Sequence, residues 1–117
     1  DLNKSSYKVS VIDTATHKKI TDIPIRGNPT SMAVIGARLY VTSCSTNTIY
    51  VIDTQTDTKS SPITIFKPYS LAALGTTLYV QRLEDNRLCV IDTVNNNMKI
   101  LDIKMPLFSS EGSARIK

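Results

Sequence analysis

The chain has 117 residues, of which 41% are hydrophobic and 21% charged, a balance typical of a single globular domain and unlike that of a disordered segment. Its longest apolar run is far shorter than the ~18 residues that a membrane-spanning helix requires, so no membrane insertion is expected. The net charge of +4 comes from basic residues spread along the chain rather than from a basic run with interleaved aromatic residues, which argues against nucleic acid as a partner.

The tetrapeptide Val-Ile-Asp-Thr occurs three times, beginning at Val11, Val51 and Val90. This spacing of about 40 residues predicts one supersecondary unit that is copied along the chain and stacked on its neighbours. Short runs rich in β-branched and aromatic residues, separated by polar loops, predict that each unit consists of four β-strands.

In chain order, residues 1–25 are expected to supply only the third and fourth strands of a unit. Residues 26–65 are predicted to form a complete unit, with strands at 31–35, 38–42, 48–53 and 59–65. Residues 66–103 repeat it, with strands at 70–74, 77–81, 87–92 and 98–103. Gly36 and Gly75 follow the first strand of each complete unit, where a tight turn favours glycine. Residues 104–117 are expected to begin the next unit.

Several of these runs are apolar at consecutive positions, as in Tyr50-Val51-Ile52. A sheet with one wet face would alternate apolar and polar residues, so both faces of each small sheet are expected to be covered. Four-stranded antiparallel units that stack face to face predict an all-β fold, a β-propeller of about three repeats that forms an incomplete ring. The half units at the two ends predict either a segment of a longer propeller or two copies that close a six-bladed ring; the first alternative is favoured.

Asp13, Asp53 and Asp92 stand at the same position of the three repeats, at the end of the third strand. An aspartate there accepts backbone N–H bonds from the next residues in an Asx-type turn. Because the three carboxylates belong to different units, they are predicted to be structural turn residues rather than one acid–base or metal site.

The chain resembles the YVTN-type β-propeller repeat family at residues 9–16, 23–29, 36–43 and 47–54. The resemblance is looser in the last repeat, where the name-giving Tyr-Val-Thr-Asn is replaced by Tyr79-Val80-Gln81-Arg82. It implies a location in the periplasm, on the cell surface or outside the cell, as for the surface-layer and periplasmic members. It implies no single activity, because its members look like scaffolds and binding surfaces, with a few cofactor enzymes among relatives.

Loops between units and loops between the second and third strands of a unit are expected to open on one face, where function concentrates on a rigid scaffold. The inter-unit loops are 26–29, 66–69 and 104–108, and the most divergent loop within a unit is 81–87. Six residues on these loops are predicted to bind a partner, with a preference for anions: Arg26, Lys67, Tyr69, Arg82, Arg87 and Lys104.

Catalytic and metal-binding groups are scarce. His17 is the only histidine and is predicted to lie in an exposed turn, and Cys44 and Cys89 occupy non-equivalent positions of their repeats. No zinc motif, Ser-His-Asp arrangement or phosphate-binding glycine loop is present, so no cofactor is expected. The sequence therefore predicts a non-catalytic scaffold that offers its loop face to a protein, a glycan or another anionic partner. The alternative is a segment of a propeller enzyme, a hydrolase or haem-type reductase, whose catalytic residues lie outside this chain.

Overall fold

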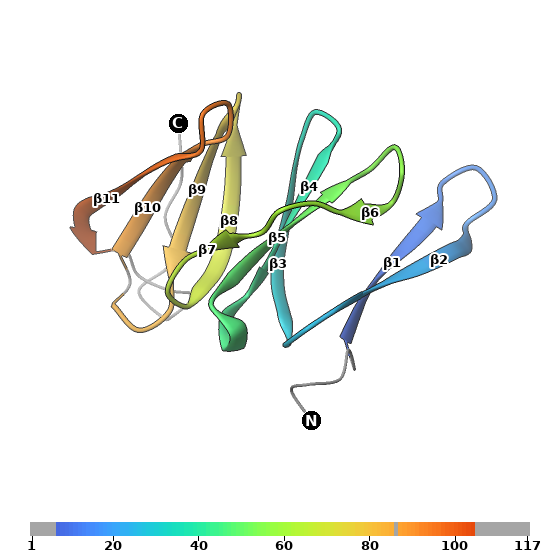
Figure 1. Cartoon of the computed structure of the whole chain (residues 1–117), viewed down its shortest axis with the longest axis horizontal. Helices are drawn as coiled ribbons and strands as arrows, with labels where there is room; N and C mark the ends of the chain where they lie inside the picture. The colour runs from blue at the N-terminus through green and yellow to red at the C-terminus, as the bar shows by residue number, and fades with distance from the viewer. Residues whose placement is uncertain (1–6, 86, 105–117) are drawn as a thin grey trace.

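The computed structural model describes residues 7–85 and 87–104, which form three antiparallel sheets arranged side by side (Figure 1). The first sheet consists of β1 (Tyr7–Asp13) and β2 (Lys18–Ile25). The second sheet consists of β3 (Pro29–Ile35), β4 (Arg38–Ser43), β5 (Thr48–Asp53), β6 (Thr58–Lys59) and β7 (Ile63–Thr64). The third sheet consists of β8 (Pro68–Leu74), β9 (Thr77–Arg82), β10 (Arg87–Asp92) and β11 (Asn97–Lys104). A short 3-10 helix, η1 (Cys44–Thr46), connects β4 to β5.

The outer strand of the second sheet differs from the prediction. A continuous strand was expected over residues 59–65, but the structure divides it into β6 and β7, which both pair with β5. The interruption falls at Ser60-Ser61-Pro62, and the missing N–H of proline is the physical reason, because proline cannot donate to a strand ladder. At the corresponding place β2 and β11 continue without a break.

The inner strands begin earlier than predicted. Pro29 and Pro68, which were expected in loops, are the first residues of β3 and β8. In both strands the pairing shifts by one residue directly afterwards, so Thr30 and Tyr69 lie at equivalent irregularities. Proline is tolerated at the first residue of a strand, and an extra residue bends the strand locally.

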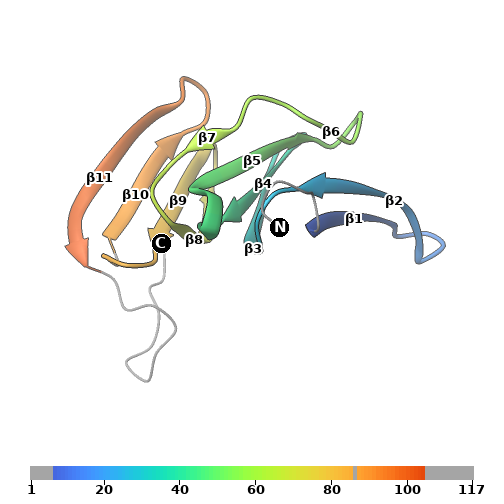
Figure 2. The ribbon, with the colours of Figure 1, turned by 60° about the horizontal axis from the view of Figure 1, so that its bottom comes forward.

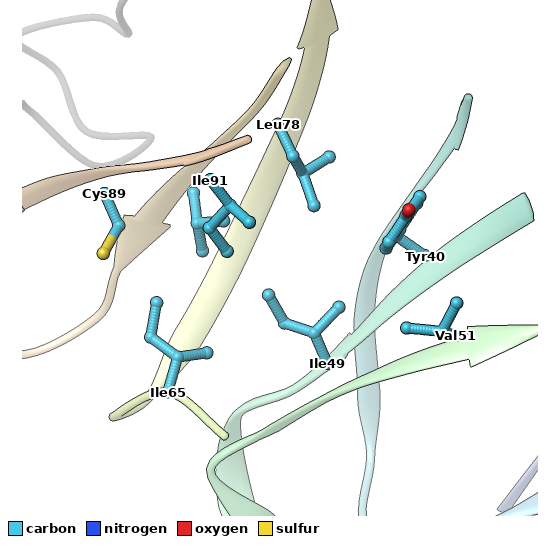
Figure 3. Packing of buried hydrophobic residues seen from close by; sticks show 8 residues of the cluster. Tyr40, Ile49, Val51, Ile65, Leu78, Cys89 and Ile91 are labelled. Atoms are coloured by element: carbon cyan, nitrogen blue, oxygen red, sulfur yellow. The ribbon is translucent and has the colours of Figure 1, made fainter. Parts of the chain in front are cut away.

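Consecutive apolar residues of β5 point to opposite faces of the second sheet. Tyr50 and Ile52 pack toward the first sheet, whereas Ile49 and Val51 pack toward the third. We call the buried cluster between the first and second sheets the first interface; it contains Val9, Ile23, Ile25, Val41 and Ile52. The second interface lies between the second and third sheets (Figure 3) and contains Tyr40, Ile49, Val51, Ile65, Leu78, Val80, Cys89 and Ile91. The prediction that both faces of the sheets are covered is thus confirmed for β4 and β5 of the second sheet.

The sheets follow one another in an open arc, with the first strands of the two four-stranded units, β3 and β8, next to each other (Figure 2). The backbone N–H of Leu71 on β8 donates to Ser31 Oγ on β3 at 3.1 Å, which ties the two strands together. Turns that follow β1, β3, β5, β8 and β10 lie at one edge of the arc, the upper edge in Figure 1. The opposite edge carries residues 26–28, 44–47, 66–67 and 83–85, which we call the loop face.

Candidate functional site

The loop face is built first by the segment that connects β2 to β3. Gly27 in this segment is buried and has φ +76°, a conformation that suits glycine. A Cβ atom there would lie 2.4 Å from Ser43 Oγ and 2.6 Å from Ser45 Oγ, so the connection can approach η1 only because residue 27 has no side chain. Ser43 Oγ donates to the Arg26 carbonyl at 3.0 Å, and Tyr50 Oη both donates to that carbonyl and accepts from the Arg26 N–H. The backbone of Arg26 is thereby fixed while its side chain is exposed.

Lys67 joins the loops of the second and third sheets. Its N–H donates to Asn47 Oδ1 at 3.0 Å, and its carbonyl accepts from the Leu83 N–H at 2.9 Å. Its ammonium lies 3.0 Å from Glu84 Oε1, and this carboxylate raises the pKa of Lys67. The predicted anion-binding cation is therefore already paired with a carboxylate of its own chain.

The loop between β9 and β10 contains a second internal ion pair. The Arg82 guanidinium binds the carboxylate of Asp85 through two nitrogens, and the Arg87 N–H donates to Asp85 Oδ1 at 3.1 Å. The Arg82 hydrogen bonds hold the pKa of Asp85 below its ordinary value. Such a closed charge pair gives the loop a defined shape and reduces the positive field that Arg82 offers to a partner.

The two remaining predicted residues, Tyr69 and Lys104, lie on strands beside this loop. Tyr69 is half-buried on β8, and its carbonyl accepts hydrogen bonds from Thr30 Oγ1 at 2.7 Å and Thr42 Oγ1 at 3.2 Å. Lys104 was predicted in an inter-unit loop, but the structure makes it the last residue of β11, paired in register with Arg87. The rest of the predicted 104–108 loop lies outside the described residues.

The threonine contact between the sheets was missed by sequence reasoning. Thr42 is completely buried, and its hydroxyl lies 2.7 Å from that of Thr30 in addition to its contact with the Tyr69 carbonyl. A buried polar group requires such partners. The available signal was the polar residue at the end of the apolar run Leu39–Val41, which sequence reasoning assigned only to the repeat.

The opposite edge carries the three aspartates. Oδ1 of Asp13 accepts the N–H groups of Ala15 and Thr16, at 2.8 and 3.3 Å. Asp53 repeats the arrangement with Gln55 and Thr56 at the same distances, and Asp92 Oδ1 accepts the Val94 N–H at 2.9 Å. In each turn the residue four positions after the aspartate has positive φ, and its N–H returns to the aspartate carbonyl; these residues are His17, Asp57 and Asn96. The aspartates thus shape three separate turns.

The cysteines are both free of disulfides. Cys44 is half-buried in η1, and Cys89 is buried in the second interface, where burial raises the pKa of its thiol. Among residues 7–85 and 87–104 there is no group of three or more His, Cys, Asp or Glu side chains placed to hold a metal ion. No helix in this part of the chain is long and apolar enough to span a membrane.

No family model and no curated protein matches the chain. Several solved structures, in contrast, match it. Hydrazine synthase from Kuenenia stuttgartiensis is 28% identical with a TM-score of 0.73, over 84% of this chain and 30% of that chain. U3-55K is 12% identical with a TM-score of 0.72, over 82% of this chain and 31% of that one. A chain in the S. cerevisiae complex of Dbp5 with Nup159, Gle1, IP6 and ADP is 19% identical with a TM-score of 0.59, over 72% of this chain and 22% of that one.

This chain therefore spans less than a third of the length of each of these matched chains. What they share with it is the architecture of four-stranded antiparallel sheets that follow one another around an axis. The described residues form an incomplete ring of β-propeller blades: two complete ones, the second and third sheets, and the β1–β2 pair of a further one.

Proposed function

We propose that the chain is a non-catalytic β-propeller module of the YVTN type, located in the periplasm, on the cell surface or outside the cell, that binds a protein, a glycan or another anionic partner through its loop face. The observation that carries the proposal is the way this face is fixed. Backbone hydrogen bonds of Arg26 and Lys67 join four separate segments into one surface. A surface that is ordered before binding loses less conformational entropy when a partner arrives.

The charges of the loop face favour an anionic partner. Counted with Arg82 and Arg87, which lie at the strand ends that flank it, the loop face has four described cations, Arg26, Lys67, Arg82 and Arg87, and two described carboxylates, Glu84 and Asp85. Arg26 is exposed and pairs with none of the described carboxylates, whereas Lys67 and Arg82 each have one. We therefore assign the main role in attraction to Arg26 and a second role to Lys104, whose backbone is in register with Arg87. Tyr69 and Arg87 complete the proposed binding surface.

Immobilised heparin, a polyanionic glycan, serves as the probe. The double variant Arg26→Glu and Lys104→Glu is expected to bind heparin several-fold more weakly and with a flatter dependence on salt, because two attractive charges become repulsive. The matched control is Lys18→Glu with Lys99→Glu, which makes the same change of net charge on exposed residues away from the loop face. Equal loss in both double variants, or no loss in the first, would contradict the proposal.

A further inference from the structure

A cavity of about 380 Å³ lies at the edge of the arc opposite the loop face, between the second and third sheets. It opens where the outer strand of the second sheet is interrupted between β6 and β7. Its volume falls within the ~300–1,000 Å³ that is usual for small-molecule sites. Its lining consists of Arg38, Tyr40, Val51, Ser60, Ser61, Pro62, Ile63 and Asn96.

The cavity coincides with a departure from the repeat. Ser60-Ser61-Pro62 stands where the first unit has Ile20-Thr21-Asp22 and the third has Lys99-Ile100-Leu101, both of which continue their strands. Ser60 is held at the mouth because its N–H and its hydroxyl both donate to the Val51 carbonyl, at 2.8 and 3.2 Å. Residues 60–62 belong to no strand, and all three are exposed. Ser60-Ser61-Pro62 thus leaves a gap between β6 and β7 at a place where β2 and β11 are continuous.

Tyr40 brings a polar group from the core to this cavity. The residue is only 2% exposed, and its ring belongs to the second interface beside Val51 (Figure 3). No described residue hydrogen-bonds its hydroxyl, although no enclosed side-chain polar atom of the described residues lacks a partner. The hydroxyl is therefore not enclosed by the core and reaches the cavity, where it is available to a ligand.

Arg38 supplies positive charge at the same place. It is exposed, lies two residues before Tyr40 on the same face of β4, and forms no ion pair with a described carboxylate. Its register partner on β5 is Asp53, whose Oδ1 is occupied by two backbone N–H groups of the following turn. Among the described residues no carboxylate lines the cavity, and Ser60, Ser61 and Asn96, which carry hydroxyl and amide groups, line it together with Arg38.

We propose that this cavity binds a small molecule through an oxyanion group, a carboxylate or a phosphate. A guanidinium presents N–H donors in a planar fork that matches two oxygens of either group, and the phenol and serine hydroxyls donate to the remaining lone pairs. The site is separate from the loop face and from any partner bound there.

Two probes test the proposal: inorganic phosphate and succinate, each titrated into the isotope-labelled chain at constant ionic strength and followed by NMR. At least one of them is expected to cause saturable shifts at the amides of Ser60, Ser61 and Asn96 and at the Arg38 side chain. Saturation by phosphate alone, by succinate alone or by both identifies the oxyanion. Shifts that do not saturate, or that spread evenly over the surface as with sodium chloride, would overturn the proposal.

Variants make the assignment specific. Arg38→Gln keeps an exposed polar side chain and is expected to weaken binding about tenfold or more, as the loss of charge-assisted hydrogen bonds does. Tyr40→Phe is expected to weaken it several-fold. Tyr79→Phe, at the equivalent position of the third sheet and outside the cavity, and Lys18→Gln, on the exposed side of β2, are the matched controls and should leave binding unchanged. Unchanged affinity in a folded Arg38→Gln variant would refute the site.

Discussion

The two interfaces of the molecule use the same second sheet but differ in how completely they cover it. In the part of the chain that the structure describes, the second interface has a four-stranded sheet on the far side and eight buried residues, whereas the first has β1 and β2 on the far side and five buried residues. The difference is visible on one strand. On β3, Ala33 and Ile35 pack into the second interface, but Met32 and Val34, which face the other way, are 57% and 59% exposed.

This contrast shows that burial in the fold is set by the number of strands that lie opposite, and not by the hydrophobicity of the residue. Met32 pairs with Val41, and Val34 with Leu39, so all four residues share one face of the second sheet. Val41 is fully buried because the first sheet covers it, while the two β3 residues lie beyond that cover. A cavity of about 420 Å³ lies at this uncovered place, between β1 and β3.

The largest expected effect compares Ile49→Ala with Ile52→Ala. Both residues lie on β5 with at most 1% exposure, but Ile49 points into the second interface and Ile52 into the first. Replacing a buried isoleucine by alanine costs about 2–5 kcal/mol, and more where the surroundings cannot collapse into the space. We expect Ile49→Ala to lower the free energy of unfolding by about 4 kcal/mol and Ile52→Ala by about 2.5 kcal/mol, measured by urea denaturation. The exposed Ile12→Ala is the control, and equal losses at the two buried sites would refute the comparison.

A second prediction concerns two glycines with left-handed backbone. Gly27 has φ +76° and hydroxyl oxygens closer than 3 Å to the place of a Cβ, whereas Gly36, with φ +58°, has no atom within 4 Å of it. Gly36→Ala should cost only the backbone strain, about 1 kcal/mol. Gly27→Ala adds overpacking and should cost about 3 kcal/mol in total. Thermal unfolding measures both, and a Gly27→Ala loss no larger than that of Gly36→Ala would show that η1 moves aside without cost.

The third prediction compares the same turn in two sheets. Asp53→Ala removes the acceptor for the Gln55 and Thr56 N–H groups and should lower the free energy of unfolding by about 1 kcal/mol, while Asp53→Asn keeps an acceptor and should lose less. Asp13 makes the same bonds in the first sheet. Because the β1–β2 pair is less covered, we expect it to open locally, so Asp13→Ala should mainly speed amide exchange within that pair and change global unfolding little. If Asp13→Ala lowers the free energy of global unfolding as much as Asp53→Ala does, the prediction that the β1–β2 pair opens locally is wrong.

Much of the fold could be predicted because the same pattern of strands and turns recurs with the Val-Ile-Asp-Thr motif, which occurs three times. The third strand of both complete units was predicted at residues 48–53 and 87–92, where the structure has it. The interruption at Ser60–Pro62 was not predicted, because Ile63 and Ile65 beside Pro62 match the pattern of a continuous strand. The bulges at Thr30 and Tyr69 depend on contacts between sheets, which single-strand patterns do not contain.

The candidate site could be predicted only in its position. Both loop types do lie at one edge of the arc, as expected from the strand order (Figure 1). The ion pairs of Lys67 with Glu84 and of Arg82 with Asp85 were missed, since they depend on how the loops fold back on each other. The cavity that Tyr40 lines was also missed. A tyrosine that recurs in an apolar run, as Tyr40 and Tyr79 do, does not indicate that its hydroxyl lies in a cavity.

The smallest expected effect is a dependence on pH that is larger in the first sheet than in the third. On the first sheet, Asp22 accepts a hydrogen bond from Ser10 Oγ at 2.7 Å and lies 3.0 Å from Lys19 Nζ and 3.3 Å from Lys8 Nζ. These contacts, the Ser10 hydroxyl first, lower the pKa of Asp22 to about 2.

The sign of the effect follows from this lowered pKa. A carboxylate whose pKa is depressed by folding stabilises the folded state at pH values above its unfolded pKa, which is about 4, and loses that contribution as the pH falls toward the folded value. The protection factors of the β1 and β2 amides, which compare their exchange rates with the intrinsic rates at each pH, should therefore fall between pH 4 and pH 2. They should fall more than those of β9 and β10, which lie next to Asp85, a described carboxyl whose pKa is also lowered. In Asp22→Asn the β1–β2 amides should be less protected already at pH 5 and show no further change across this window. If the wild-type β1–β2 amides keep their protection down to pH 2, or if Asp22→Asn shows the same pH dependence, the Asp22 contacts do not hold the first sheet together.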